Sequence, residues 1–147
     1  MLYSGDTDQM APLFEMYRKA LPLLKDRTRT YFNHDGIFCS ETIYFWGLNR
    51  EHDFGAGNSD MYPKNAYIRY YWDSGNELSM MMLDYYAHTG DDGFARNTLI
   101  PIADEVVTFY DLHHQRTPEG KVLFSPSMSL ETWHTAEDPL PTVVGLN

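Results

Sequence analysis

The sequence predicts an all-α fold, and three observations lead to that prediction. Apolar residues recur at helical spacing in three segments, at about residues 8–30, 74–88 and 92–114. Two polar, irregular stretches, residues 36–63 and 125–141, are long for idle connections in a compact domain. A 147-residue chain with 43% hydrophobic residues can form one ordinary domain with a sizeable core.

The first helix is expected over about residues 8–30. Its apolar stripe consists of Met10, Leu13, Phe14, Tyr17, Leu21 and Leu24. Pro22 should kink this helix, because proline removes a backbone donor and clashes with the preceding turn. Residues 33–36, which include Asn33 and Gly36, are expected to end it.

The second helix is expected to begin near Tyr67 or Ser74 and to end at about His88, with Gly90 as its stop signal. Its apolar face consists of Leu78, Met81, Met82, Tyr85 and Tyr86. Met80, Met81 and Met82 are consecutive, so they cover more than one side of the helix. Three helices cannot bury that breadth, which predicts exposed apolar surface and self-association of the chain.

The third helix is expected over about residues 92–114. Its stripe consists of Leu99, Ile102, Ala103, Val106, Phe109 and Tyr110. Pro101 fits either the first turn of a helix that starts after Thr98 or a kink within one long helix. Beyond it, residues 117–120 are expected to form a turn and residues 121–124 a short strand.

The order of elements repeats, although no short sequence repeat is present. A helix, a turn and a helix are followed by a long loop with a glutamate and a tryptophan. The first long loop contains Glu41 and Trp46, and the second contains Glu131 and Trp133. This order is typical of a toroid of helical hairpins whose long loops open on one face. Three helices do not close such a toroid.

Composition excludes several classes of partner. The net charge of −10 argues against nucleic acids and anionic membranes, which would repel the chain. Cys39 is the only cysteine, so the sequence has no internal disulfide. No apolar run is long enough for a transmembrane helix, and the N-terminus lacks a signal peptide. Localisation is therefore unassigned, with secretion or a periplasmic location open for a longer protein.

The ten residues FSPSMSLETW, at 124–133, carry the strongest chemical signal. A tryptophan ring can pack on a sugar, and its bulk can raise the pKa of a neighbouring carboxyl so that it holds a proton near neutral pH. Glu131 and Trp133 form such a pair in sequence. The alternative interpretation is a surface loop with a helix-capping Ser/Glu pair and a partly buried tryptophan.

Other candidates lie in the same two loops. Glu41 could line a cleft or cap a helix, and both interpretations remain open. Trp46 and Trp133 are candidates for stacking on sugar rings, and His134 is a further substrate-binding candidate. Trp72 is expected in the core.

The six histidines have no ligand-like spacing, and HExxH and GxSxG motifs are absent, so neither a metal, a cofactor nor a serine hydrolase site is predicted.

Several stretches resemble one superfamily of enzymes. Residues 70–114, YYWDSGNELSMMMLDYYAHTGDDGFARNTLIPIADEVVTFYDLHH, look like a helical hairpin of the six-hairpin glycosidases, which are (α/α)6 barrels. FSPSMSLETW resembles the Ser-Pro-Ser-x-Ser-Pro-Glu-Asn stretch of the inverting α-L-fucosidase family. SGDTDQMAPLFEMY and GIFCSETIYFWG, at residues 4–17 and 36–47, look like an uncharacterised glycosidase-like branch.

The resemblance implies a function and one catalytic position. The motif's general acid falls on Glu131, whereas Leu130 and Thr132 replace the family's proline and asparagine. The family's general base would lie beyond Asn147 and its water-positioning asparagines before Met1. The helix signal at the start and the unfinished PTVVGLN at the end agree with this. We therefore expect residues 1–147 to be a fragment of a catalytic domain that cleaves an oligosaccharide or polysaccharide, and to have little activity alone.

Two alternatives stay open at this point. The chain could be a non-catalytic helical module that binds a carbohydrate or a protein through its aromatic loops. It could also belong to a helical lyase, which would need a tyrosine or histidine base and a cation beside a uronate. Tyr44, Arg50 and His134 offer those groups.

Overall fold

The computed structural model describes residues 2–47, 69–129 and 133–139. Two short 3-10 helices, η1 and η2, precede the long helix α1, and α2 follows after the first long loop. The remaining elements are α3, a π-helical segment η4, α4 and two short strands. Their bounds are η1 Leu2–Ser4, η2 Thr7–Gln9, α1 Ala11–Phe32, α2 Ser74–Thr89, α3 Asp92–Phe94, η4 Ala95–Leu99, α4 Ile100–His113, β1 Gln115–Arg116 and β2 Val122–Leu123. The described chain is mainly helical, which confirms the all-α prediction.

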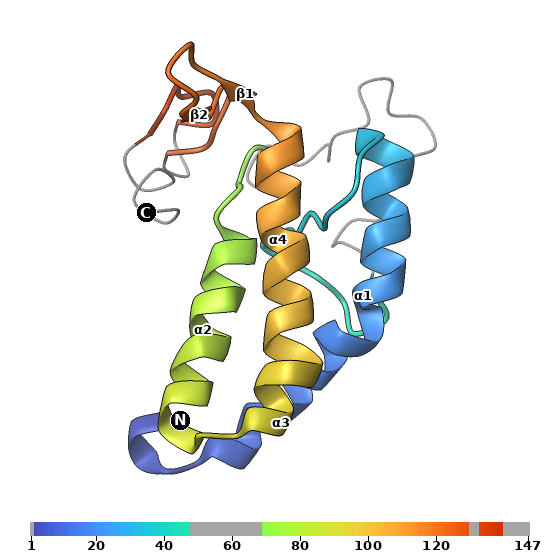
Figure 1. The fold of residues 1–147 in the computed structure, drawn as a ribbon, viewed down its shortest axis with the longest axis vertical. Helices are drawn as coiled ribbons and strands as arrows, with labels where there is room; N and C mark the ends of the chain where they lie inside the picture. The colour runs from blue at the N-terminus through green and yellow to red at the C-terminus, as the bar shows by residue number, and fades with distance from the viewer. Residues whose placement is uncertain (1, 48–68, 130–132, 140–147) are drawn as a thin grey trace.

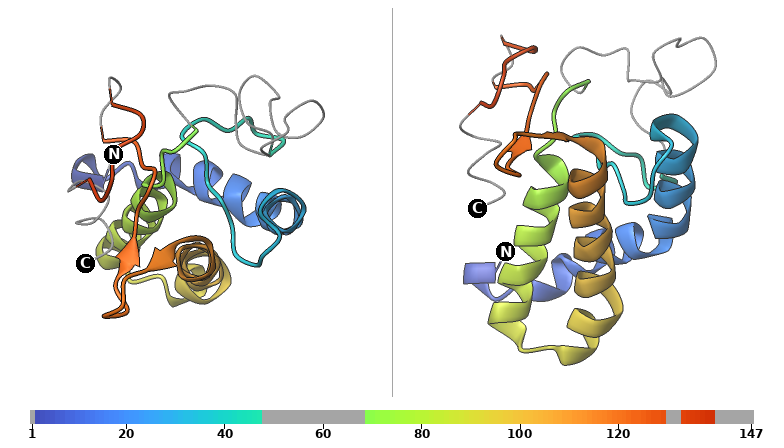
Figure 2. Two further views of the ribbon diagram at one scale, coloured as in Figure 1. Left: turned by 90° about the horizontal axis from the view of Figure 1, so that it is seen from above. Right: turned by 45° about the horizontal axis from the view of Figure 1, so that its top comes forward.

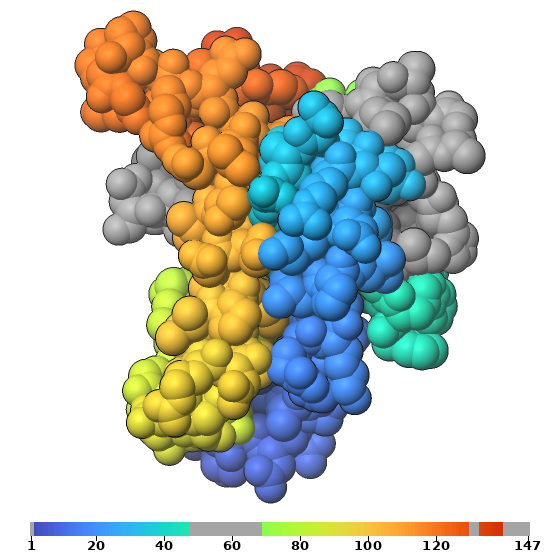
Figure 3. All heavy atoms as spheres, turned by 45° about the vertical axis from the view of Figure 1, so that its right-hand side comes forward, coloured from blue at the N-terminus to red at the C-terminus, as the bar shows by residue number. Residues whose placement is uncertain are grey.

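The helices α2 and α4 lie side by side and antiparallel, joined by a short turn after α2 (Figure 1). The helix α1 crosses behind this pair at one end and then rises along α4, and its surface meets that of the α3–α4 helix over much of their length (Figure 3). The two strands project beyond the C-terminal end of α4, close to the N-terminal end of α2 (Figures 1 and 2).

The helix α1 begins at Ala11 and ends at Phe32, slightly later at both ends than expected. Asn33 ends it with a left-handed backbone, φ 60°, and its N–H donates to the Arg29 carbonyl at 3.1 Å. Asparagine tolerates this conformation, which explains why the helix stops there. Pro22 lies inside the helix, and α1 changes direction along its length, as the sequence predicts (Figures 1 and 2).

The segments α3, η4 and α4 form one continuous helix rather than a new helix after Thr98. The Asp91 carboxylate caps it by accepting the Phe94 N–H at 3.0 Å. The Ile100 N–H donates to the Ala95 carbonyl, five residues back, in the π-helical turn. Pro101 follows directly, and the widened turn accommodates a residue that has no N–H to donate.

The core lies between the three long helices and the segment that follows α1. Trp72, predicted to be a core residue, is 4% exposed. Residues 36–40 were predicted to be part of a polar, irregular loop, but they are buried. Gly36, at φ 91°, makes this possible, because a Cβ there would lie 2.3 Å from the Phe109 backbone nitrogen. The Ile37 N–H then donates to the Glu105 carbonyl of α4 at 3.0 Å.

The predicted turn and short strand after α4 are confirmed. Strand β2 pairs antiparallel with β1, with Gln115 opposite Leu123 and Arg116 opposite Val122. The Thr117 N–H donates to the Lys121 carbonyl at 2.8 Å and closes the turn. This small hairpin leads the chain from the end of α4 into residues 124–138.

Apolar side chains remain exposed on the outer sides of the helices. Met82 is fully buried, whereas Met80 and Met81 are 56% and 40% exposed. The three consecutive methionines therefore do cover more than one side of α2, as their spacing predicts. None of the helices in the described part of the chain has the length and apolarity to cross a membrane.

Candidate active site

The segment that carries the motif forms a narrow loop, here named the 124–138 loop. At its base the Asp138 carboxylate accepts the Phe124 N–H at 2.7 Å, and the Asp138 N–H donates to the Phe124 carbonyl at 2.8 Å. Ser127 and Ala136 exchange two backbone hydrogen bonds, at 2.8 and 2.7 Å. These pairs hold the two arms of the loop side by side.

Glu131, the predicted acid, lies outside the described residues, whereas Ser129 and Trp133 on either side are described. The Ser129 N–H donates to the Trp133 carbonyl at 3.0 Å, so the arms stay paired up to the residues on either side of 130–132. Trp133 is 60% exposed, and His134 is half-buried. More than half of the Trp133 surface is thus accessible to solvent, which is compatible with both a sugar platform and the alternative of a partly buried ring in a surface loop.

The 124–138 loop is attached to residues 69–73, which lead into α2. The indole N–H of Trp72 donates to the Pro126 carbonyl at 2.9 Å. The Met128 N–H donates to the Tyr70 carbonyl, also at 2.9 Å. The Tyr110 hydroxyl of α4 donates to the Trp72 carbonyl and fixes this segment to the helices. The loop is therefore held by both a side chain and the backbone.

Glu41 lies on the surface near this attachment. It belongs to no helix, so the capping interpretation is wrong. Its charge acts on Tyr71, whose hydroxyl donates to Glu77 Oε1 at 2.9 Å. Burial, the hydrogen bond to Glu77 and the nearby carboxylates raise the pKa of Tyr71 well above its ordinary value. Tyr71 therefore stays a neutral hydroxyl beside an acidic surface.

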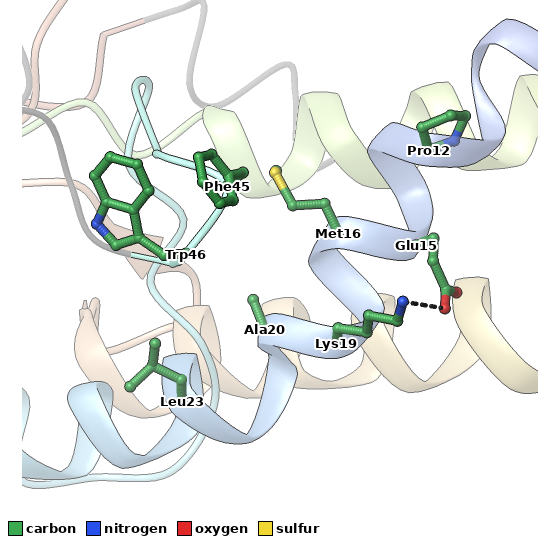
Figure 4. Close-up of a pocket in the computed structure, with 8 residues that line it drawn as sticks. All are labelled: Pro12, Glu15, Met16, Lys19, Ala20, Leu23, Phe45 and Trp46. Atoms are coloured by element: carbon green, nitrogen blue, oxygen red, sulfur yellow. Dashed lines mark ion pairs between the residues drawn. The ribbon is translucent and has the colours of Figure 1, made fainter.

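Trp46 lies in a different place. Its ring stacks on Tyr44, with centroids 4.4 Å apart, and it is 46% exposed. Together with Phe45 it faces α1 across a hollow of about 480 Å³ (Figure 4). The hollow is lined by Pro12, Glu15, Met16, Lys19, Ala20, Leu23, Phe45 and Trp46. Residues 44–47 and 133–139 are well separated in Figures 1 and 2, so the structure does not bring Trp46 and Trp133 into one cluster.

Sequence reasoning missed a group of half-buried histidines beneath the 124–138 loop, which consists of His34, His113 and His114. His34 Nε2 lies 3.0 Å from His113 Nδ1, and the His114 ring packs on Phe124 with centroids 4.5 Å apart. Burial and the neighbouring imidazoles lower the pKa of His113 to about 3, and burial and His34 lower that of His114 to about 4. His113 and His114 are adjacent in the sequence, and His34 is far from both. Their spacing therefore gives no signal of a metal site or a catalytic site.

These histidines do not form a metal site. Among residues 2–47, 69–129 and 133–139, no group of three or more His, Cys, Asp or Glu side chains is arranged to hold a metal ion. His113 stacks on Phe109, with centroids 4.6 Å apart. His113 and His114 are neutral packing groups near neutral pH, and they support the base of the loop.

The comparison with protein families identifies the chain. A family model described as the glycosyl hydrolase family 95 catalytic domain matches residues 7–145. Searches of curated proteins and of solved structures give no match. The match covers nearly the whole sequence, including the helices and the 124–138 loop. The chain therefore belongs to glycosyl hydrolase family 95, a glycoside hydrolase family of the six-hairpin superfamily whose substrates are carbohydrates.

Proposed function

We propose that this chain supplies the general acid, Glu131, of a hydrolase that cleaves a glycosidic bond with inversion. The observation that carries the proposal is the 124–138 loop. Its Ser-Pro-Ser-x-Ser-x-Glu sequence contains Glu131, which comes two residues before the exposed Trp133. Ser129 and Trp133, on either side of residues 130–132, are paired by a backbone hydrogen bond. A carboxyl beside an aromatic sugar platform is what protonation of a glycosidic oxygen requires.

Inversion needs a second carboxylate that activates water from the opposite face of the sugar. The two carboxyl groups of inverting glycosidases are about 6.5–9.5 Å apart, which leaves room for that water. The motif resemblance places the base in a later hairpin, outside residues 1–147. We therefore propose that these residues are one part of a larger catalytic domain and have little activity alone. The exposed apolar residues of α2 and α4, among them Met80 and Val107, support this, because further hairpins would cover them.

Substrate contacts would come from both long loops. Trp133 and His134 flank the acid on one side and would contact the sugar at the scissile bond. Glu41, near Tyr71, would accept hydrogen bonds from sugar hydroxyls. Trp46, in its separate hollow, would contact a sugar unit remote from the reaction.

The motif is most similar to that of the α-L-fucosidases, but the residues next to the acid differ. Leu130 and Thr132 replace a proline and an asparagine immediately before and after the acid in the sequence. A panel of aryl glycosides that includes α-L-fucoside would identify the sugar. NMR of the anomer first released would separate inversion from retention.

The variant Glu131→Gln tests the acid in the full-length protein. Glutamine keeps the shape but cannot donate the proton, so we expect the rate to fall by about 10²- to 10⁴-fold. An aryl glycoside whose leaving group is a weak base needs no protonation and should retain most of its rate. Glu137→Gln changes an exposed carboxylate in the same loop and is the matched control.

A loss below a few-fold for Glu131→Gln, on a substrate with a poor leaving group, would sink the assignment. Carbohydrate binding without hydrolysis by the full-length protein would instead favour the non-catalytic binding module.

A further inference from the structure

Two side chains outside the motif help the backbone hydrogen bonds to hold the 124–138 loop in place. The Trp72 indole N–H holds Pro126 from the helix side, and the Asp138 carboxylate holds Phe124 at the base of the loop. We propose that Trp72 and Asp138 are positioning residues that align the loop carrying Glu131 for proton donation. This inference rests on the proposed role of Glu131.

Trp72 is suited to this role because it is buried in the core and hydrogen-bonded. It is almost fully buried, with its ring against His113 at 4.9 Å and Phe38 at 5.6 Å between centroids. Its carbonyl accepts a hydrogen bond from the Tyr110 hydroxyl. The indole N–H is the side chain's one donor, and it is used on the Pro126 carbonyl at 2.9 Å. The core of the helices is thereby linked directly to the loop.

Asp138 closes the other end of the loop. Its backbone adopts φ 43°, a conformation that aspartate, asparagine and glycine tolerate better than other residues. Its N–H and its carboxylate both bond to the backbone of Phe124, at 2.8 and 2.7 Å. Phe124 is itself buried against His114 and Tyr110. The end of the loop at Asp138 is therefore held against a residue of the core.

Loss of either bond would loosen the loop without removing any group that touches the substrate. General-acid catalysis depends on the alignment of the proton with the leaving oxygen, and a misplacement of about 1 Å can cost up to about 10²-fold in rate. Binding of the sugar depends less on this alignment. A positioning role therefore predicts a lower kcat with a nearly unchanged KM.

The variant Trp72→Phe, made in the full-length protein, keeps the buried aromatic ring and removes the N–H. We expect kcat to fall by about 10- to 100-fold on a substrate with a poor leaving group. The rate on an activated aryl glycoside should change by less than about threefold, because that substrate does not need the acid. Thermal unfolding of the same variant measures any general loss of stability.

Asp138 allows a matched pair that does not disturb the core. Asp138→Asn and Asp138→Gly both tolerate the positive φ, but only asparagine keeps an oxygen that can accept the Phe124 N–H. We expect Asp138→Asn to stay close to the original rate. Asp138→Gly should show the same leaving-group-dependent loss as Trp72→Phe.

The results separate this inference from the proposed function. If Glu131→Gln shows the leaving-group dependence and neither Trp72→Phe nor Asp138→Gly does, the positioning roles are wrong and the acid stands. Equal losses on both substrates in these variants would also overturn the positioning roles. If Glu131→Gln itself shows no such dependence, the proposed function fails, and this inference fails with it.

Discussion

His34 Nε2 and His113 Nδ1 lie 3.0 Å apart, so a hydrogen bond between two imidazoles joins the residues after α1 to the end of α4. One ring must accept and the other must donate, which requires at least one neutral imidazole. The Phe32, Phe109 and Trp72 rings surround His113. This aromatic setting disfavours a positive charge on His113.

The stability of the protein should decrease in mild acid. The pKa of His113 is lowered to about 3 and that of His114 to about 4, from an ordinary value of 6.5. Below pH 6.5 the unfolded chain binds protons that the folded protein does not. The free energy of unfolding therefore decreases as the pH is lowered. At pH 5 the loss should be on the order of 2 kcal/mol for each imidazole.

Urea unfolding at pH 7.5 and pH 5 measures this loss. His113→Phe removes one of the buried imidazoles and should make the free energy of unfolding less dependent on pH. His88→Gln removes an exposed imidazole of α2 and serves as the control. Identical pH dependence in the original protein and in His113→Phe would contradict the prediction.

The Thr28 hydroxyl should contribute measurably to stability. It is buried in α1, donates to the Leu24 carbonyl at 3.0 Å and accepts the Phe38 N–H at 3.0 Å. Thr28→Val keeps the shape but leaves the Phe38 N–H without its acceptor, which should cost about 1–3 kcal/mol in the free energy of unfolding.

Two further variants define the Thr28 effect. Thr28→Ser retains the hydroxyl and should recover a large part of the loss. Thr30→Val removes an exposed hydroxyl that donates to the Asp26 carbonyl in the same helix, and it should change the free energy little. If Thr28→Val and Thr30→Val were equally stable by thermal unfolding, the hydrogen bond between Thr28 and Phe38 would not contribute to the stability of the protein.

The 147-residue chain should self-associate through its exposed apolar surface. Met80 and Leu83 are three residues apart, so they are neighbours on the outer side of α2. The double variant Met80→Glu, Leu83→Glu should shift the chain towards monomer in sedimentation velocity. The control double variant Ala87→Glu, Gln115→Glu adds the same charge at exposed positions with less apolar surface. A monodisperse monomer with a cooperative unfolding transition would rule out this prediction.

Helical periodicity and stop signals were sufficient to predict the helices. Gly90 and Asn33 end α2 and α1 in left-handed conformations because the local sequence favours them. The burial of residues 36–40 could not be predicted, since it depends on Gly36 packing against Phe109, far away in the sequence. Long-range contacts of this kind leave no periodic pattern.

The roles of the candidate site residues stay predictions, and the sequence indicates them only where the signal is local. The motif indicates Glu131 and Trp133, because their spacing and chemistry are local. The attachment of Pro126 to Trp72 and the pairing of Tyr71 with Glu77 were missed. The bond between Trp72 and Pro126 joins residues 54 positions apart. Tyr71 and Glu77 are six positions apart, which is not a spacing that brings side chains together on a helix. Trp46 and Trp133 lie in two separate parts of the structure. Their separation depends on the tertiary fold, which the local sequence does not reveal.

The π-helical turn at Ala95–Leu99 accommodates one more residue than a regular α-helical turn. Ala95 and Leu99 are buried within the turn, and Ile102 and Phe109 are buried after it. Because five π-helical residues turn through about the same angle as four α-helical residues, deleting one residue within the turn would restore regular winding and leave the orientation of α4 nearly unchanged. A deletion later in α4 has no widened turn to absorb it and would rotate the residues that follow by about 100°. His113 and His114 would then leave their places beneath the 124–138 loop. The helix should therefore tolerate a one-residue change of length at the turn but not beyond it.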